Sequence, residues 1–146
     1  MAFTALDVKK LREQTGCGMM DCKKALTESD GDFDKAVEYL REKGLAAAAK
    51  KAGRIAAEGM VYAAADVANK VGVVIEVNAE TDFVAKNDSF QTFVKEVADV
   101  VMAQNPADVE ALMACKLGEQ TVEAALQEKI LVIGENIKIR RFARFE

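Results

Sequence analysis

The side chains that could carry out chemistry in this sequence are carboxylates and thiols, because its 146 residues include no histidine. The usual general base, the Ser–His and Cys–His nucleophile pairs and the commonest metal ligand are therefore missing. Glu76 and Glu80 could share one strand face, but such a pair is more often a solvated face than an acid–base pair. Cys17, Cys22 and Cys115 form no CxxC pair and are typical of small buried apolar residues. We therefore predict that the chain is not an enzyme and holds no metal.

Motifs and charge argue against nucleotides, nucleic acids and membranes as binding partners of this chain. Neither a GxxxxGK[ST] nor a GxGxxG loop occurs, so we expect no nucleotide or other cofactor on this chain. Residues 1–54 hold 11 lysines and arginines against 9 acidic residues, and the remainder holds 9 against 15, for a net charge of −4. This acidity argues against general nucleic-acid binding. The sequence has no apolar run long enough for a membrane span and no signal-peptide core, which predicts a cytoplasmic protein without a membrane partner.

A binding surface, rather than a reaction, is what the segment around Phe83 indicates. The preceding run, Val71 to Ala79, alternates in hydrophobicity and predicts a half-buried strand. The following run, residues 89–103, has apolar residues at helical spacing. Between them lies an aromatic side chain in a short polar loop. Two interpretations remain open: Phe83 packs back under its own helix, or the strand end presents it to a partner as an anchor.

The same segment, Asn78 to Asn87, is one of three motifs, with Leu11 to Leu26 and Ile133 to Arg141, that resemble elongation factor Ts, the nucleotide exchange factor of the GTPase elongation factor Tu. Asn78 to Asn87 (NAETDFVAKN) is similar to the signature of that family. Leu11 to Leu26 resembles its N-terminal signature, and Ile133 to Arg141 resembles the motif that closes a half of its core domain. The motifs follow the family's order and span nearly the whole chain. The resemblance implies the N-terminal domain plus the first half of the core domain.

Residues 1–54 are expected to form a three-helix bundle with a helical connector. Thr4 and Asp7 fit a capping box for the first helix, and Gly44 is expected to close the third. An alanine-rich stretch with Lys50, Lys51 and Arg54 follows and favours a helical connector. The bundle resembles the ubiquitin-associated-type domain at the N-terminus of the family. We place the domain boundary near residue 54.

Residues 55–146 are expected to form an α+β half of the core. Met60 to Ala65 and Val71 to Ala79 predict a β-hairpin, and the β-prone run from Ile137 to Phe145 predicts a third strand. Apolar spacing in that run changes parity between Ile139 and Phe142, which indicates a bulge. The fold class is therefore α+β, with a three-stranded antiparallel sheet and helices on one face.

Two adjacent methionines indicate a second candidate surface. Met19 and Met20 lie in the first turn of the second predicted helix, beside Lys23. Neighbouring helical side chains point about 100° apart, so we expect one methionine in the core and the other exposed. An exposed methionine beside lysines suits a protein-binding face.

The resemblance implies guanine nucleotide exchange on elongation factor Tu, in its GDP-bound and nucleotide-free states. In the family the segment corresponding to residues 81–84 enters the GTPase, disturbs its magnesium site and weakens its hold on the phosphates. Phe83 would be the wedge, and Asp82 would compete for hydrogen bonds within the partner. The bundle would hold the partner's nucleotide-binding domain. The implied site residues are Thr81, Asp82, Phe83, Val84, Met19, Met20 and Lys23.

The sequence leaves open a second function and the question of whether the chain is part of a longer protein. A bundle like residues 1–44 also occurs in ubiquitin-binding and nascent-chain proteins, so a plain binding module without exchange activity is the second hypothesis. Long family members continue with a second core half, so the chain is either a fragment of a longer protein or a natural short form. An uncovered sheet surface near Phe142 and Phe145 leads us to expect a homodimer through residues after 59.

Overall fold

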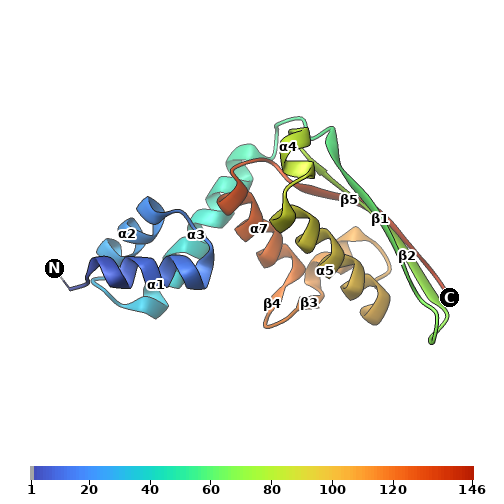
Figure 1. The fold of residues 1–146 in the computed structure, drawn as a ribbon, viewed down its shortest axis with the longest axis horizontal. Coiled ribbons are helices and arrows are strands. Elements are labelled where there is room, and N and C mark those ends of the chain that lie inside the picture. The colour runs from blue at the N-terminus through green and yellow to red at the C-terminus, as the bar shows by residue number, and fades with distance from the viewer. Residues whose placement is uncertain (1) are drawn as a thin grey trace.

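The computed structural model describes residues 2–146 and is divided between a helical bundle and a sheet covered by helices (Figure 1). The bundle consists of α1 (Ala5–Thr15), α2 (Met19–Glu28) and α3 (Phe33–Lys51). Thr4 caps α1, and Asp7 completes the predicted capping box by accepting the Thr4 backbone N–H at 2.8 Å. Gly16 ends α1 in the left-handed conformation, with φ 73°. The three helices enclose one apolar cluster, made of Val8, Leu11, Cys17, Cys22, Ala25, Leu26, Ala36 and Leu40.

The third helix is longer than the sequence predicted. Gly44 does not close it, because α3 runs without a break from Phe33 to Lys51. Gly44 is instead a buried helical residue, and a β-carbon placed there would lie 3.3 Å from the backbone oxygen of Gln127 in α7 (Val122–Ile133). The missing side chain allows α3 and α7 to approach closely. The helix that was expected to end at residue 43 therefore joins the bundle to the rest of the molecule.

The sheet has three antiparallel strands, as predicted, and their order is β1-β2-β5. β1 (Glu58–Asp66) pairs with β2 (Val71–Ala79), which also pairs with β5 (Lys138–Phe145). The predicted bulge is confirmed: Glu76 lies opposite Arg141 whereas Val77 lies opposite Ile139, so Arg140 has no partner in the register.

Helices cover one face of this sheet (Figure 1). They are α4 (Asp82–Ala85), α5 (Asp88–Gln104) and α6 (Val109–Ala114). A small hairpin, β3 (Lys116–Leu117) and β4 (Gln120–Thr121), precedes α7, which packs on α3 and α6. Val73, Ile75 and Val77 of β2 pack on the apolar side of α5, which includes Phe90 and Phe93. The mixed helix and antiparallel sheet confirm the α+β class. Within residues 2–146 no helix has the length and apolar character needed to cross a membrane.

Candidate partner-binding site

Phe83 stands on a single helical turn at the end of the central strand. Thr81 caps α4, and its Oγ1 accepts the backbone N–H of Val84 at 3.4 Å. Val84 is buried in the core, whereas 82% of the Phe83 side chain is exposed. The interpretation in which Phe83 packs under its own helix is therefore wrong. Asp82 is also exposed, and its carboxylate lies 3.8 Å from the Lys86 ammonium group.

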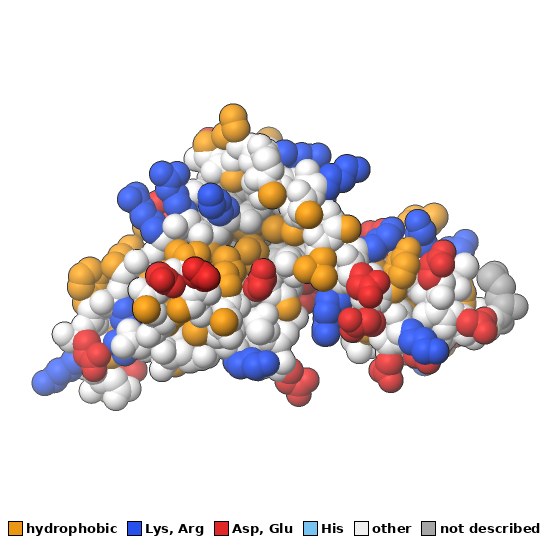
Figure 2. Space-filling view, turned by 180° about the vertical axis from the view of Figure 1, so that it is seen from behind, with side chains coloured by type: hydrophobic (Ala, Val, Ile, Leu, Met, Phe, Trp, Pro, Cys, Tyr) orange, Lys and Arg blue, Asp and Glu red, His pale blue; other side chains and the backbone are white. Residues whose placement is uncertain are grey.

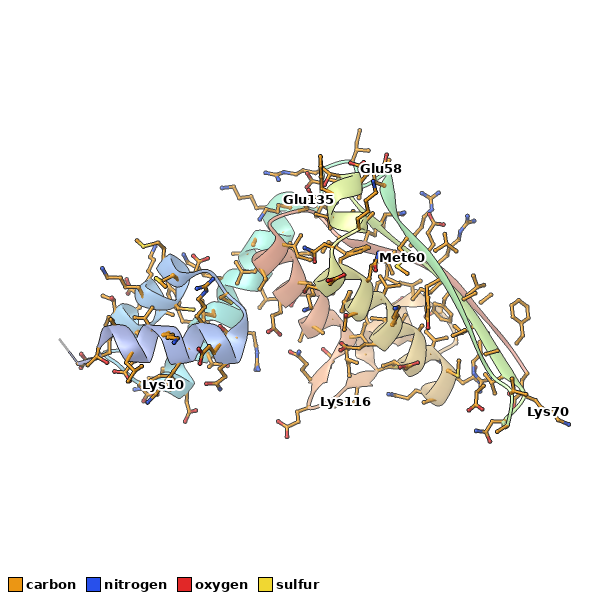
Figure 3. All side chains as sticks on the ribbon, viewed as in Figure 1. Lys10, Glu58, Met60, Lys70, Lys116 and Glu135 are labelled. Carbon is orange, nitrogen blue, oxygen red and sulfur yellow. The ribbon has the colours of Figure 1, made fainter. Side chains whose placement is uncertain are left out.

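The start of α4 is hydrogen-bonded to Glu135, the second residue after α7. One carboxylate oxygen of Glu135 accepts the backbone N–H groups of Glu80 and Thr81 at 3.1 and 3.0 Å. The other accepts the Thr81 hydroxyl at 2.7 Å. Figure 3 shows Glu135 close to α4, in the segment that leads from α7 to β5. Two of the three motifs found in the sequence, around Thr81 and around Glu135, are thus brought into direct contact.

Glu80 and Asn136 add further polar contacts between the same segments. Glu80 Oε1 accepts the backbone N–H of Asn136 at 2.7 Å and lies 3.5 Å from the Arg54 guanidinium group. The Asn136 side-chain amide donates to the backbone oxygen of Arg54 at 2.8 Å. The segment after α3, the end of β2 and the segment after α7 are therefore tied together by polar contacts. We call this cluster, Arg54, Glu80, Thr81, Glu135 and Asn136, the polar clamp.

Sequence reasoning missed the clamp. The residue pattern suggests only Glu76 as a partner for Glu80, on a strand face, and assigns Glu135 no role beyond its motif. The two members of the Glu135–Thr81 pair are 54 positions apart, and no local periodicity connects them. The nearest available signal was the presence of both residues in segments with a family resemblance.

Glu76 has a different environment from Glu80. It accepts a hydrogen bond from the Asn78 amide at 3.1 Å and one from the Arg141 guanidinium at 2.8 Å, and Arg140 lies 4.0 Å away. The Asn78 hydrogen bond, followed by the Arg141 contact, lowers the pKa of Glu76. Each of the two glutamates is committed to its own donors, and the pair forms no shared acid–base site.

Met19 and Met20 are both exposed, at 53% and 74%, so the expected burial of one of them is wrong. The buried face of α2 consists of Cys22, Ala25 and Leu26. Met19 lies one turn before Cys22, at the first residue of α2, and helical side chains point toward the helix N-terminus. Its side chain is therefore directed beyond the packed part of the helix. Lys23 is exposed as well.

The structure does not combine the two candidate groups in one patch. Figure 1 places α2 in the bundle and α4 above the sheet, with α3 between them. Any partner that contacts both groups must reach across two separate surfaces.

The thiols of the bundle are buried and poorly suited to reaction. Cys17 and Cys22 are free, and burial raises the pKa of both thiols. The Cys22 thiol lies within 3.8 Å of the Cys17 backbone oxygen, which accepts its weak hydrogen bond. Within the described residues, no group of three or more cysteine, aspartate or glutamate side chains is arranged to hold a metal ion.

Comparison with known proteins gives a consistent result. Residues 80–146 match the family model described as "Elongation factor TS". The chain is 59% identical to elongation factor Ts of Trichlorobacter lovleyi, over 99% of this chain and 48% of that protein. It is 54% identical to that of Alkalilimnicola ehrlichii, over 99% of this chain and 50% of that protein, and 59% identical to that of Clostridium perfringens, over 98% and 48%. The chain therefore spans about half the length of these relatives. The resemblance seen in the motifs is confirmed: over nearly its whole length, this chain is similar to the elongation factors Ts.

Proposed function

We propose that this chain acts in translation elongation, in the cytoplasm, by promoting release of GDP from elongation factor Tu. The observation that carries the proposal is Phe83, which is 82% exposed on a turn anchored by the buried Val84 and by Glu135. An exposed aromatic on a rigid support is the usual form of a binding anchor. The relatives are named elongation factors, which supports a role in elongation, and the motif resemblance implies elongation factor Tu as the partner.

The proposed mechanism is linkage between two binding events. A factor that binds the nucleotide-free GTPase more tightly than the GDP-bound form weakens GDP binding by the same factor. Full burial of Phe83 in the partner would contribute about 1.5–3 kcal/mol. The exposed Asp82 carboxylate would compete for hydrogen bonds near the magnesium and phosphate site, and Thr81 and Val84 would fix the turn from within. No covalent step occurs, so the chain is an exchange factor and not an enzyme in the usual sense.

We further propose two functional domains, residues 1–54 and 55–146. Each contains its own apolar cluster, which supports the division. The first would hold the nucleotide-binding domain of the GTPase through Met19, Met20 and Lys23. The second would carry the exchange segment, residues 81–84.

A homodimer through the second domain is also proposed. Phe142, which was expected on the open surface, faces the helices instead, because it lies opposite Ile75 and packs against the core cluster. The face of the sheet opposite the helices exposes Val61 and Phe145, at 67% and 65%. Figure 2 shows hydrophobic side chains reaching the surface of the half of the molecule that carries the sheet. An exposed apolar sheet face favours association with another surface.

The proposed function is tested by measuring the affinity of the chain for elongation factor Tu with and without GDP. We expect tight binding to the nucleotide-free GTPase and a loss of affinity as GDP is added. Equal affinity for the two forms would contradict exchange and would favour a plain binding module, since a ligand without differential affinity shifts no equilibrium.

A further inference from the structure

The segment that carries Phe83 is too short to keep its shape alone. α4 has four residues, and an isolated helix of this length does not form in water. Its conformation must therefore be imposed by contacts outside the turn. The buried Val84 supplies one such contact, after the aromatic residue. The contact before the aromatic residue is the polar clamp.

Within the clamp, Glu135 makes the contacts that set where the turn begins. Its carboxylate accepts two backbone N–H groups, of Glu80 and Thr81, and the Thr81 hydroxyl. Hydrogen bonds to an ionised carboxylate are stronger than those between neutral groups. The Thr81 hydroxyl donates to Glu135 and accepts the Val84 N–H, so the carboxylate and the first turn of α4 are joined through one oxygen atom.

Glu135 is itself held in place. Gly134 ends α7 in the left-handed conformation, with φ 83°, and turns the chain toward β2. The backbone N–H of Asn136, the residue after Glu135, donates to the side chain of Glu80, and Glu80 directly precedes Thr81, to which Glu135 is bonded. The carboxylate therefore lies on a fixed backbone and is partly buried, against the backbone that leads into α4.

We propose that Glu135 is a positioning residue for the exchange segment: it fixes the start of α4 so that Phe83 is presented in its binding conformation before the partner arrives. The ordering of α4 is inferred from the hydrogen bonds of Glu135, and its effect on exchange rests on the proposed function. Without the clamp, the segment must be ordered during binding, and this lost conformational freedom weakens affinity. The saturated complex would still contain Phe83 in the same place, so the maximal exchange rate would be kept.

The first measurement is local and does not depend on the function. Amide hydrogen exchange of residues 80–86 is compared in the natural chain, in Glu135→Ala and in Glu123→Ala. Glu123 is a matched control, because it is an exposed glutamate at the other end of α7. We expect exchange in this segment to accelerate at least tenfold in Glu135→Ala only, with unchanged protection in α5. Equal protection in all three proteins would overturn the proposal.

The second measurement separates affinity from rate. In a titration of GDP release from elongation factor Tu, Glu135→Ala should raise the half-saturating concentration about tenfold and leave the plateau rate within about twofold. Glu123→Ala should behave as the natural chain, and Thr81→Val, which removes the hydroxyl that donates to Glu135, should resemble Glu135→Ala. The double variant Glu135→Ala, Thr81→Val should be no weaker than either single variant, because both remove the same link.

The outcomes distinguish the two proposals. A lower plateau with an unchanged half-saturating concentration would show that Glu135 does not act through preorganisation. If the natural chain releases no GDP while the amide result holds, the proposed function fails and the role of Glu135 in ordering the segment stands.

Discussion

Phe83 and Val84 are adjacent apolar residues with opposite environments, 82% and 9% exposed. The cause is the single helical turn of α4, which contains both residues and directs Val84 into the core and Phe83 away from it. The sequence predicted an aromatic in a polar loop but left its direction open, because direction depends on the turn and on Glu135. Local patterns identified the residue, and only the tertiary contacts determined its exposure.

The two exposed methionines lead to a prediction about the bundle. Met19→Ala and Met20→Ala should each change the free energy of unfolding by less than about 0.5 kcal/mol, because neither side chain is packed. Both should weaken binding to elongation factor Tu. Leu26→Ala, which truncates a fully buried neighbour in the same helix, should cost about 2–5 kcal/mol of stability. Calorimetric unfolding and binding titrations check this, and unchanged binding in both methionine variants would exclude them from the interface.

Glu76 leads to a prediction about pH. The pKa of Glu76 is lowered in the folded chain, so its contribution to stability is present above its ordinary value of 4.5 and is lost as the pH falls through the lowered value. Glu76→Gln should therefore reduce Tm at pH 7, and the difference from the natural chain should shrink below pH 4.5. Glu58→Gln, on the neighbouring strand, is the control. A difference independent of pH would show that the charge of Glu76 is not what stabilises the sheet.

Among the elements, α3 shows most clearly where sequence reasoning reached its limit. Gly44 after Lys43 is a typical helix ending, so the sequence predicts a separate helical connector in the alanine-rich stretch instead of one continuous helix. The structure makes Gly44 a site of close helix contact, which requires knowledge of α7. By contrast, the alternation in β2 and the parity change in β5 predicted the sheet and its bulge correctly, since both are local. The short hairpin of β3 and β4 was not predicted, because two-residue strands carry no periodicity.

The contact between α3 and α7 can be tested by overpacking. Gly44→Leu should lower the free energy of unfolding by about 1–3 kcal/mol, because a side chain there would press on the backbone of Gln127. Ala46→Leu, on the exposed side of the same helix, should have little effect. Thermal unfolding of both variants checks the prediction. Equal stability of the two would show that α3 and α7 can separate without loss.

The whole molecule consists of two apolar clusters connected through α3 and α7. Ala48 of α3 packs on the larger cluster and Leu131 of α7 packs on the smaller one, so the two helices contribute to both. The connection is therefore a packed interface rather than a free linker. It sets the spacing between the exposed methionines and Phe83, which matters if one partner contacts both.

The exposed sheet face gives a prediction about assembly. We expect a concentration-dependent homodimer that forms through residues after 59, and Phe145→Lys should weaken it by replacing an exposed apolar side chain of the open face with a charge. Lys23→Glu, in the bundle, should leave it unchanged. Sedimentation velocity over a wide concentration range measures this. A monomer at all concentrations would show that the open face does not bind a second copy.

Stopped-flow measurement of GDP dissociation from elongation factor Tu tests most directly whether the exposed Phe83 drives nucleotide release. The natural chain should accelerate release of a fluorescent GDP, and Phe83→Ala should lose at least about tenfold of that acceleration while its Tm stays unchanged. The tenfold loss corresponds to about 1.4 kcal/mol, at the lower end of the burial energy of such a side chain. Equal acceleration by both proteins, or a sharp fall in the Tm of Phe83→Ala, would contradict the account.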